Sequence, residues 1–206
     1  MDKFLDKIFF RSKNLNYISK NIKNISQNTP AKKIFEAINN YSENSELRFV
    51  GGCIRKIINR EEVDDIDLAT NITPDEVCQA LNKHQIKFFE SGKEHGTITA
   101  VINEQNYEIT SLRKDVVTDG RHAKVEFTSD WKEDSKRRDF TINSIYSDLD
   151  GNLFDPFDGI KDLKKNMEFS TTGKKSNLCL FCFPFDLQLR TPSFCPLARH
   201  WLTLAG

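Results

Sequence analysis

Residues 49–77 read FVGGCIRKIINREEVDDIDLATNITPDEV, and the order of apolar runs and chain breaks in them decides the predicted fold. Leu47–Val50 is predicted to be a short buried strand, and Cys53–Ile58, after two glycines, a helix. Asp65–Ala69 is predicted to be a second strand. Another helix follows it, because Thr73 starts a capping box with a proline in the first turn. Strands and helices that alternate in this way indicate a sheet with helices packed on it.

The segments on both sides are predicted from the same periodicities. The expected helices are Ala31–Asn39, Trp131–Ser147 and Ile160–Lys165, and the expected strands are Ile86–Phe89, Gly96–Ile102, Asn106–Leu112 and Asn152–Phe154. Lys114–Lys124 is polar and contains an Asp-Gly pair, so it is predicted to be a loop. The predicted fold class is therefore α+β, a small mixed or antiparallel sheet flanked by helices.

The charge balance and the cysteines exclude several classes of protein. The 206 residues include 30 Lys and Arg and 30 Asp and Glu, so the formal net charge is zero and a globally basic nucleic-acid coat is excluded. No apolar run approaches the roughly 20 residues that span a bilayer, and the chain begins with a poor secretory signal, so no membrane partner is expected. Five cysteines do not make a disulfide scaffold, which indicates a reducing, cytoplasmic context.

Composition divides the chain into three predicted parts. Residues 1–30 are basic and rich in Asn, and they are expected to form a helix or a mobile extension. Residues 31–167 form the predicted main domain. Residues 168–206 hold only six charged residues but three of the five cysteines, and they show no sustained helical or strand period. We interpret this atypical tail as a truncated, frame-shifted or divergent segment.

Three carboxylates carry the strongest local signal for chemistry. In a strand, Asp65 and Asp67 project from the same face, because side chains alternate with a period of two. Two carboxylates this close repel each other unless a divalent cation lies between them. Glu108 points to the same site if its neighbours Tyr107 and Ile109 face the core. Three carboxylates on adjacent strands could hold two Mg²⁺ for phosphoryl transfer. The alternatives are a solvated acidic turn and an exposed strand residue.

A glycine pair precedes these carboxylates at the predicted junction of a strand and a helix. Gly51 and Gly52 allow a ligand to approach the backbone closely. The helix that follows presents free N–H groups and the positive end of its dipole to a phosphate. Arg55 in the first turn adds a charge-assisted contact. The alternative is a tight turn with a surface arginine.

The segment KRRDFTIN around Arg137 and Arg138 is the other charged cluster. On a helix these two arginines point to different sides, so one can face a phosphate; the alternative is a charged helix start. Asn143 is interpreted as a polar core residue or as a side chain that stabilises the helix. His95 could touch a substrate, although a lone histidine is more often structural. The Cys179–Cys182 pair lacks the second half of a zinc site, so no zinc is predicted.

Three separate segments together resemble a known family. They are residues 49–77, HGTITAVINEQNYEITSLRKD at 95–115, and KRRDFTINSIYSDLDGNLFDPFDGIKDLKKN at 136–166. They resemble the bacterial tRNA nucleotidyltransferase (CCA-adding enzyme) and poly(A) polymerase family, within the polymerase-β-like nucleotidyltransferases. The resemblance covers about residues 31–167, in the order that the family has.

The resemblance implies a nucleotidyltransferase head domain and a role for each matching residue. Asp65 and Asp67 match the metal-binding pair, Glu108 matches the third acidic position, and Gly51, Gly52, Arg55 and Arg138 lie where the family contacts the nucleotide. The implied reaction is attack of an RNA 3′-hydroxyl, that of tRNA above all, on the α-phosphate of CTP or ATP. The implied cofactor is Mg²⁺, and no protein nucleophile is needed.

The chain departs from the family pattern after Met167. The family continues there into a neck with an E-D-x-x-R motif that reads the base of the nucleotide, and then into helical body and tail domains. This sequence has no such motif, so the neck and body are expected to be missing. The alternatives to CCA addition are therefore a poly(A) polymerase, an inactive head that only binds nucleotide or RNA, and a head completed by a separate chain.

Overall fold

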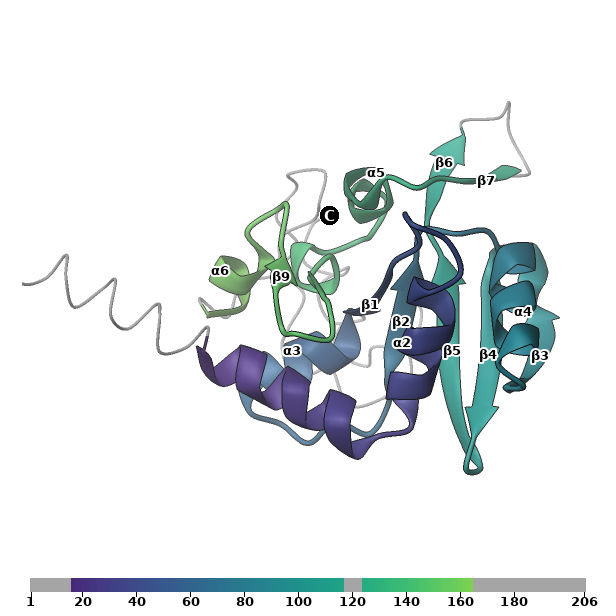
Figure 1. Ribbon diagram of the computed structural model, residues 1–206. Coiled ribbons are helices and arrows are strands. Elements are labelled where there is room, and N and C mark those ends of the chain that lie inside the picture. Colours follow the sequence, from purple (N-terminus) through teal and green to yellow (C-terminus); the bar gives the residue numbers. More distant parts are fainter. Residues whose placement is uncertain (1–15, 117–123, 165–206) are drawn as a thin grey trace, which may run out of the picture. The chain divides into compact units, whose positions relative to one another are not determined.

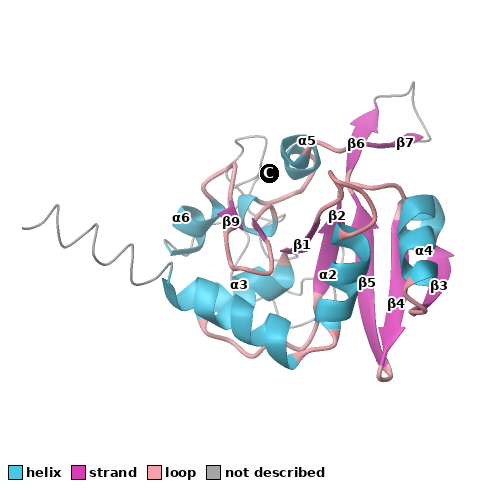
Figure 2. Ribbon diagram, in the orientation of Figure 1, coloured by secondary structure: helices cyan, strands magenta, loops and turns pink. Residues whose placement is uncertain are grey.

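A seven-stranded mixed sheet forms the centre of the computed structural model, which describes residues 16–116 and 124–164 (Figure 1 and Figure 2). The strand order is β3-β4-β5-β2-β1-β8-β9; β2 and β5 run parallel, and all other neighbours are antiparallel. The strands are β1 (Leu47–Val50), β2 (Asp67–Thr70), β3 (Lys87–Gly92), β4 (Thr97–Ile102), β5 (Gln105–Ser111), β8 (Tyr146–Ser147) and β9 (Leu153–Phe154). A separate antiparallel pair consists of β6 (Arg113–Val116) and β7 (Lys124–Phe127).

Helices flank this sheet, and the α+β class is thereby confirmed. They are α2 (Ala31–Asn39), α3 (Gly52–Asn59), α4 (Pro74–Lys83), α5 (Trp131–Lys136) and α6 (Gly159–Lys164), with a further helix over 16–28 and 3-10 turns at Lys93–His95 and Thr141–Asn143. The predicted capping box of α4 is present, because Thr73 and Glu76 each accept the other's backbone N–H. Within the described ranges, no helix has the length and apolar character needed to cross a membrane.

The two faces of the sheet differ in what covers them. One face packs its buried side chains, among them Leu68, Ile98 and Ile109, against α2 and α4, which lie together on that side (Figure 1). The other face carries Asp67 and Glu108. Among the residues that the structure describes, the apolar cluster on this face lies around α5 and β8 and consists of Val50, Ala69, Leu112, Trp131 and Tyr146. Burial on one face thus leaves part of the opposite face free for polar side chains.

Most predicted elements are confirmed to within about two residues. The helix at Ala31–Asn39 and the strand at Leu47–Val50 have the predicted bounds. The hairpin between β4 and β5 is tighter than predicted, because Ile102 already pairs with Gln105 and only two residues, both with positive φ, form its turn. The strand predicted at Asp65–Ala69 begins at Asp67 instead.

The prediction that Trp131–Ser147 is largely helical is wrong. Helix α5 is short, and a 3-10 turn and strand β8 follow it. Tertiary contacts override the helical pattern, because Tyr146 pairs with Val50 of β1 and its ring packs on Trp131 with centroids 5.2 Å apart.

The loop predicted over Lys114–Lys124 is also wrong at both of its ends, which belong to β6 and β7. Lys114 lies opposite Glu126 in this strand pair, and their side chains form an ion pair at 2.8 Å. A pair of strands with such charged side chains has the composition of a loop, which explains the error. Residues 117–123 lie outside the described part, as do residues 1–15 and 165–206, including the Cys179–Cys182 pair.

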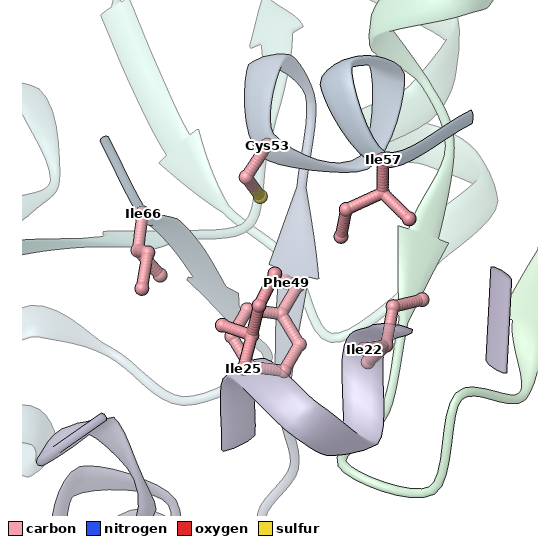
Figure 3. A pocket seen from close by; sticks show the side chains of 6 residues that line it. All are labelled: Ile22, Ile25, Phe49, Cys53, Ile57 and Ile66. Atoms are coloured by element: carbon pink, nitrogen blue, oxygen red, sulfur yellow. The ribbon is translucent and has the colours of Figure 1, made fainter. Parts of the chain in front are cut away.

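The helix over 16–28 packs on the core of the main domain. Ile18 and Ile22 are buried there, at 2% and 1% exposure. Figure 3 shows this helix from close by, where a narrow apolar gap that has no room for a water molecule is lined by Ile22, Ile25, Phe49, Cys53, Ile57 and Ile66. These contacts do not support a division of the chain at residue 30, and the boundaries at residues 30 and 167 stay predictions.

Replacing Ile22 by alanine should therefore destabilise the main domain by about 2–5 kcal/mol, because it leaves a cavity between the helix and β1. Chemical denaturation monitored by circular dichroism measures this change in the free energy of unfolding. Lys20→Ala, an exposed position on the same helix, is the matched control and should change it by less than about 0.5 kcal/mol. Equal, small effects of both variants would contradict the packing of this helix.

Candidate active site

Asp67 and Glu108 lie side by side on the open face of the sheet. Parallel strands β2 and β5 place Asp67 directly opposite Glu108, and neighbouring strands lie about 4.8 Å apart. Tyr107 and Ile109 are buried on the other face, so Glu108 points away from the core, as the alternation in the sequence predicted. Two carboxylates from strands far apart in sequence thus share one surface.

Asp65 approaches the same surface from the loop that leads into β2. It is exposed and precedes the strand, so the strand alternation used to place it beside Asp67 does not apply. Its carboxylate is nevertheless close enough to act on Asp67 electrostatically. Burial raises the pKa of Asp67 above its ordinary value, and the charges of Glu108 and Asp65 raise it further.

Two arginines counteract this rise in the pKa of Asp67. The positive charges of Arg138 and Arg55 lower its pKa and partly offset the effect of burial and of the other carboxylates. Four residues that the sequence predicted for metal or nucleotide contacts thus lie close enough to Asp67 to change its pKa. They are Asp65, Glu108, Arg55 and Arg138. Such a mixed field suits a ligand that brings both a cation and an anionic group.

The donor chemistry of this surface fits a magnesium ion that a nucleotide helps to bind. Asp65 and Asp67 offer carboxylate oxygens, which hard cations prefer, and their mutual repulsion would be relieved by a divalent charge. In the described part of the chain, no three His, Cys, Asp or Glu side chains converge closely enough to hold a metal by themselves. Mg²⁺ commonly takes only one or two carboxylates and completes its shell with phosphate oxygens and water.

The second glycine of the pair lies next to Asp67. Gly51 has a positive φ of 68°, a conformation that favours glycine, and immediately precedes α3. Gly52 begins α3, and a Cβ atom there would lie 3.9 Å from Asp67 Oδ2. A side chain at position 52 would therefore begin in van der Waals contact with the Asp67 carboxylate, and glycine leaves this carboxylate accessible from the helix N-terminus. Backbone N–H groups at such a terminus are suited to bind phosphate.

Arg55 is held by a residue from a distant segment. Its Nη1 donates to Oδ1 of Asn143 at 2.8 Å, which joins α3 to the 3-10 turn at Thr141–Asn143. The sequence had offered Asn143 only as a core or helix-stabilising residue. Its contact with Arg55 became visible only when the fold brought the two segments together.

Arg138 is anchored by a buried carboxylate that sequence reasoning missed. Asp134 has no exposed side-chain surface and accepts from Arg137 Nε at 2.8 Å, from Arg138 Nε at 3.0 Å and from the Tyr146 hydroxyl at 2.7 Å. Burial raises the pKa of Asp134, but Arg138 and Arg137 outweigh it and leave the pKa below its ordinary value. The spacing of Asp134 three and four residues before the arginines was a signal that could have been used.

His95 and Cys53 are two further residues of a type that can take part in catalysis. His95 is exposed, and its carbonyl accepts from Arg113 Nη1 at 2.8 Å. Cys53 is a buried thiol next to β2; burial and the charge of Asp67 raise its pKa to about 12. A thiol that stays protonated is a poor nucleophile. In residues 16–116 and 124–164 the geometry therefore offers a carboxylate and arginine surface that could serve phosphoryl chemistry, and no cysteine there is activated.

Comparisons of sequence and structure show which known proteins this chain is similar to. The chain is 51% identical over 123 residues to human "CCA tRNA nucleotidyltransferase 1, mitochondrial" (59% of this chain, 28% of that protein) and 41% identical over 124 residues to the "CCA-adding enzyme" of Staphylococcus aureus strain MRSA252 (59% and 30%). The crystal structure of the Bacillus stearothermophilus CCA-adding enzyme in complex with CTP matches with a TM-score of 0.58 at 29% identity (69% of this chain, 33% of that chain). The matched part of this chain spans less than a third of either curated relative.

A family model extends these pairwise similarities. The model of the poly A polymerase head domain matches residues 47–167, which is more than half of the chain and includes all seven residues predicted to form the site. The resemblance inferred from the three sequence segments is thus confirmed. The chain belongs to the poly A polymerase head domain family.

Proposed function

We propose that this chain is a template-independent nucleotidyltransferase that adds CMP and AMP, taken from CTP and ATP, to the 3′ end of tRNA. The observation that carries the proposal is the pairing of Asp67 with Glu108 on parallel strands, within electrostatic reach of Asp65, Arg55 and Arg138. Relatives named as CCA-adding enzymes, one of them with CTP in its crystal structure, support the choice of substrates.

The proposed reaction is a single displacement at phosphorus. The 3′-hydroxyl oxygen of the RNA forms a bond to the α-phosphorus of the nucleotide, and the bond from that phosphorus to the pyrophosphate oxygen breaks. The hydroxyl proton passes to solvent, and pyrophosphate leaves. Because such reactions depend mainly on positioning and charge, the chain needs no nucleophile of its own.

Each part of the site has a proposed role in this displacement. The first turn of α3, kept accessible by Gly51 and Gly52, donates N–H groups to the triphosphate. Arg55 and Arg138 supply positive charge to the phosphate oxygens. Asp65 and Asp67 would hold Mg²⁺, with Glu108 beside them, and bound Mg²⁺ would activate the hydroxyl and neutralise the triphosphate.

Poly(A) addition is the second candidate function. The family model that matches residues 47–167 carries the name of the poly A polymerase head domain, which favours it. The proposed roles of the site residues concern the phosphates and the metal, not the base of the nucleotide. These residues therefore suit CCA addition and poly(A) addition equally.

We also propose a reducing compartment, the cytoplasm, for this chain. Cys53 and Cys78 are both free and buried in the described part of the chain, as expected for a protein that does not rely on disulfides. The human relative is named as mitochondrial. Fluorescence microscopy of the tagged chain in its own cell would decide between the two compartments.

The proposal is tested by incubating the protein with labelled CTP and ATP, separately and together, and with tRNA that lacks its CCA end or with oligo(A). Ordered addition of C and A to tRNA that requires Mg²⁺ and stops with a chelator is the expected result. Addition of A alone to both RNAs would favour the poly(A) alternative. Binding of nucleotide without addition to either RNA would contradict both transferase functions and favour a head that only binds.

A further inference from the structure

Asn143 links the two arginines whose positive charges act on Asp67. Its side-chain oxygen accepts from Arg55 Nη1 at 2.8 Å, and its backbone carbonyl accepts from Arg138 Nη1 at 3.4 Å. Arg55 lies 88 positions away in the sequence. One residue therefore connects the α3 segment with the segment after α5, each of which carries one positive charge of the site.

The orientation of the Asn143 amide follows from the chemistry of its partner. A guanidinium group only donates hydrogen bonds, so the amide oxygen must face Arg55. A charge-assisted bond of this kind restricts the rotamers of a long side chain. Arg55 is thereby given a defined direction at the N-terminal turn of α3.

The turn that carries Asn143 is itself tightly held. Thr141 Oγ1 donates to Asp162 Oδ2 of α6 at 2.9 Å. A Cβ atom on Gly159, at the start of α6, would lie only 2.2 Å from the Thr141 carbonyl oxygen, so only glycine allows this approach. The Gly51 N–H donates to the carbonyl of Ile145, just beyond the turn, at 3.3 Å. Asn143 is thus a fixed point between α6 and the glycine pair.

From these contacts we infer that Asn143 is a positioning residue for nucleotide binding, which aims Arg55 at the phosphate groups of the incoming nucleoside triphosphate. The inference rests on the proposed function, since it assigns Arg55 to the triphosphate. Asn143 acts through Arg55 and needs no contact with the substrate itself.

The test is a double-mutant cycle on CTP binding in the presence of Mg²⁺, with KM and kcat measured in parallel. Asn143→Ala should weaken CTP binding and raise KM by roughly tenfold, the size expected when a charge-assisted hydrogen bond is lost. In an Arg55→Ala background the same substitution should change CTP binding by less than about twofold, because the arginine that Asn143 positions is no longer present. An equal loss in both backgrounds would overturn the positioning role.

Two further variants separate positioning from folding. Asn152→Ala also removes an amide hydrogen bond, that to Asp148 Oδ2 at 2.7 Å, but outside the site, and should bind CTP as the wild type does. Asn143→Asp keeps an oxygen acceptor for Arg55, and with it the direction of the arginine, so it should bind CTP more tightly than Asn143→Ala does. CTP binding by Asn143→Asp that is as weak as that of Asn143→Ala would contradict the inference.

The outcomes also distinguish this inference from the proposed function. If Arg55→Ala weakens CTP binding while Asn143→Ala does not, the proposed function stands and the positioning role is wrong. If the wild-type protein binds no CTP with Mg²⁺, the proposed function fails, and the role of Asn143 fails with it.

Discussion

Replacing Asp67 by asparagine should lower the rate of nucleotide addition by about a thousandfold or more. The substitution keeps the size of the side chain but removes a carboxylate that lies opposite Glu108 on the open face of the sheet. Loss of a metal ligand removes several kcal/mol of transition-state stabilisation, and each 1.36 kcal/mol corresponds to about tenfold in rate. Single-turnover addition of labelled CTP to tRNA, with saturating Mg²⁺, measures the effect on chemistry.

Asp64 provides a matched control for this experiment. It lies in the same acidic run, but its carboxylate pairs with Lys56 and it is exposed. Asp64→Asn should therefore keep most of the activity. An Asp67→Asn protein that adds nucleotides as fast as Asp64→Asn would show that this carboxylate is not a metal ligand.

Replacing Asp134 by asparagine should destabilise the fold by about 3–5 kcal/mol. The buried carboxylate accepts from Arg137, Arg138 and Tyr146, and an amide leaves the two guanidinium groups without their counter-charge. Urea denaturation measures the change. Glu133→Gln, which removes only a half-exposed ion pair with Lys136, is the control and should cost less than about 1 kcal/mol.

The same carboxylate predicts a dependence of stability on pH. The pKa of Asp134 is lower in the folded protein than in the unfolded chain, so its ionisation stabilises the fold at pH values above the unfolded pKa of about 3.9. This contribution is lost as the pH falls toward the folded pKa. Below about pH 5 the wild type should therefore lose stability more steeply than Asp134→Asn. Parallel acid profiles for the two proteins would contradict this assignment.

The sequence predicted which face of the sheet carries Glu108, but not how the strands around it pair. The period-two alternation correctly predicted that Glu108 points away from the core. It could not show that β2 pairs in parallel with β5, because strand pairing is a non-local property. The alternation also predicted Asp65 to be a strand residue, although the strand begins only at Asp67. Local periodicity thus reports which face a side chain occupies, and tertiary pairing decides which side chains meet.

The errors beyond residue 130 have the same origin. The stretch that contains Asp134 and Arg138 has a helical composition, but the chain leaves the helix so that Tyr146 can join the sheet and bond to Asp134. For residues 1–30 the sequence left open a helix or a mobile extension; the structure has a helix over 16–28, and Ile18 and Ile22 of this helix are part of the core. In both places, contacts with distant residues decide the structure.

The central claim is that the triphosphate and its metal bind on the open face of the sheet, between the carboxylates and the arginines. A crystal structure of the protein with CTP and Mn²⁺, with the metal located by anomalous scattering, tests it most directly. The predicted result is manganese at the carboxylates of Asp65 and Asp67, with the triphosphate at the start of α3 and next to Arg55 and Arg138. Manganese and CTP bound elsewhere on the molecule, away from Asp67, would contradict it.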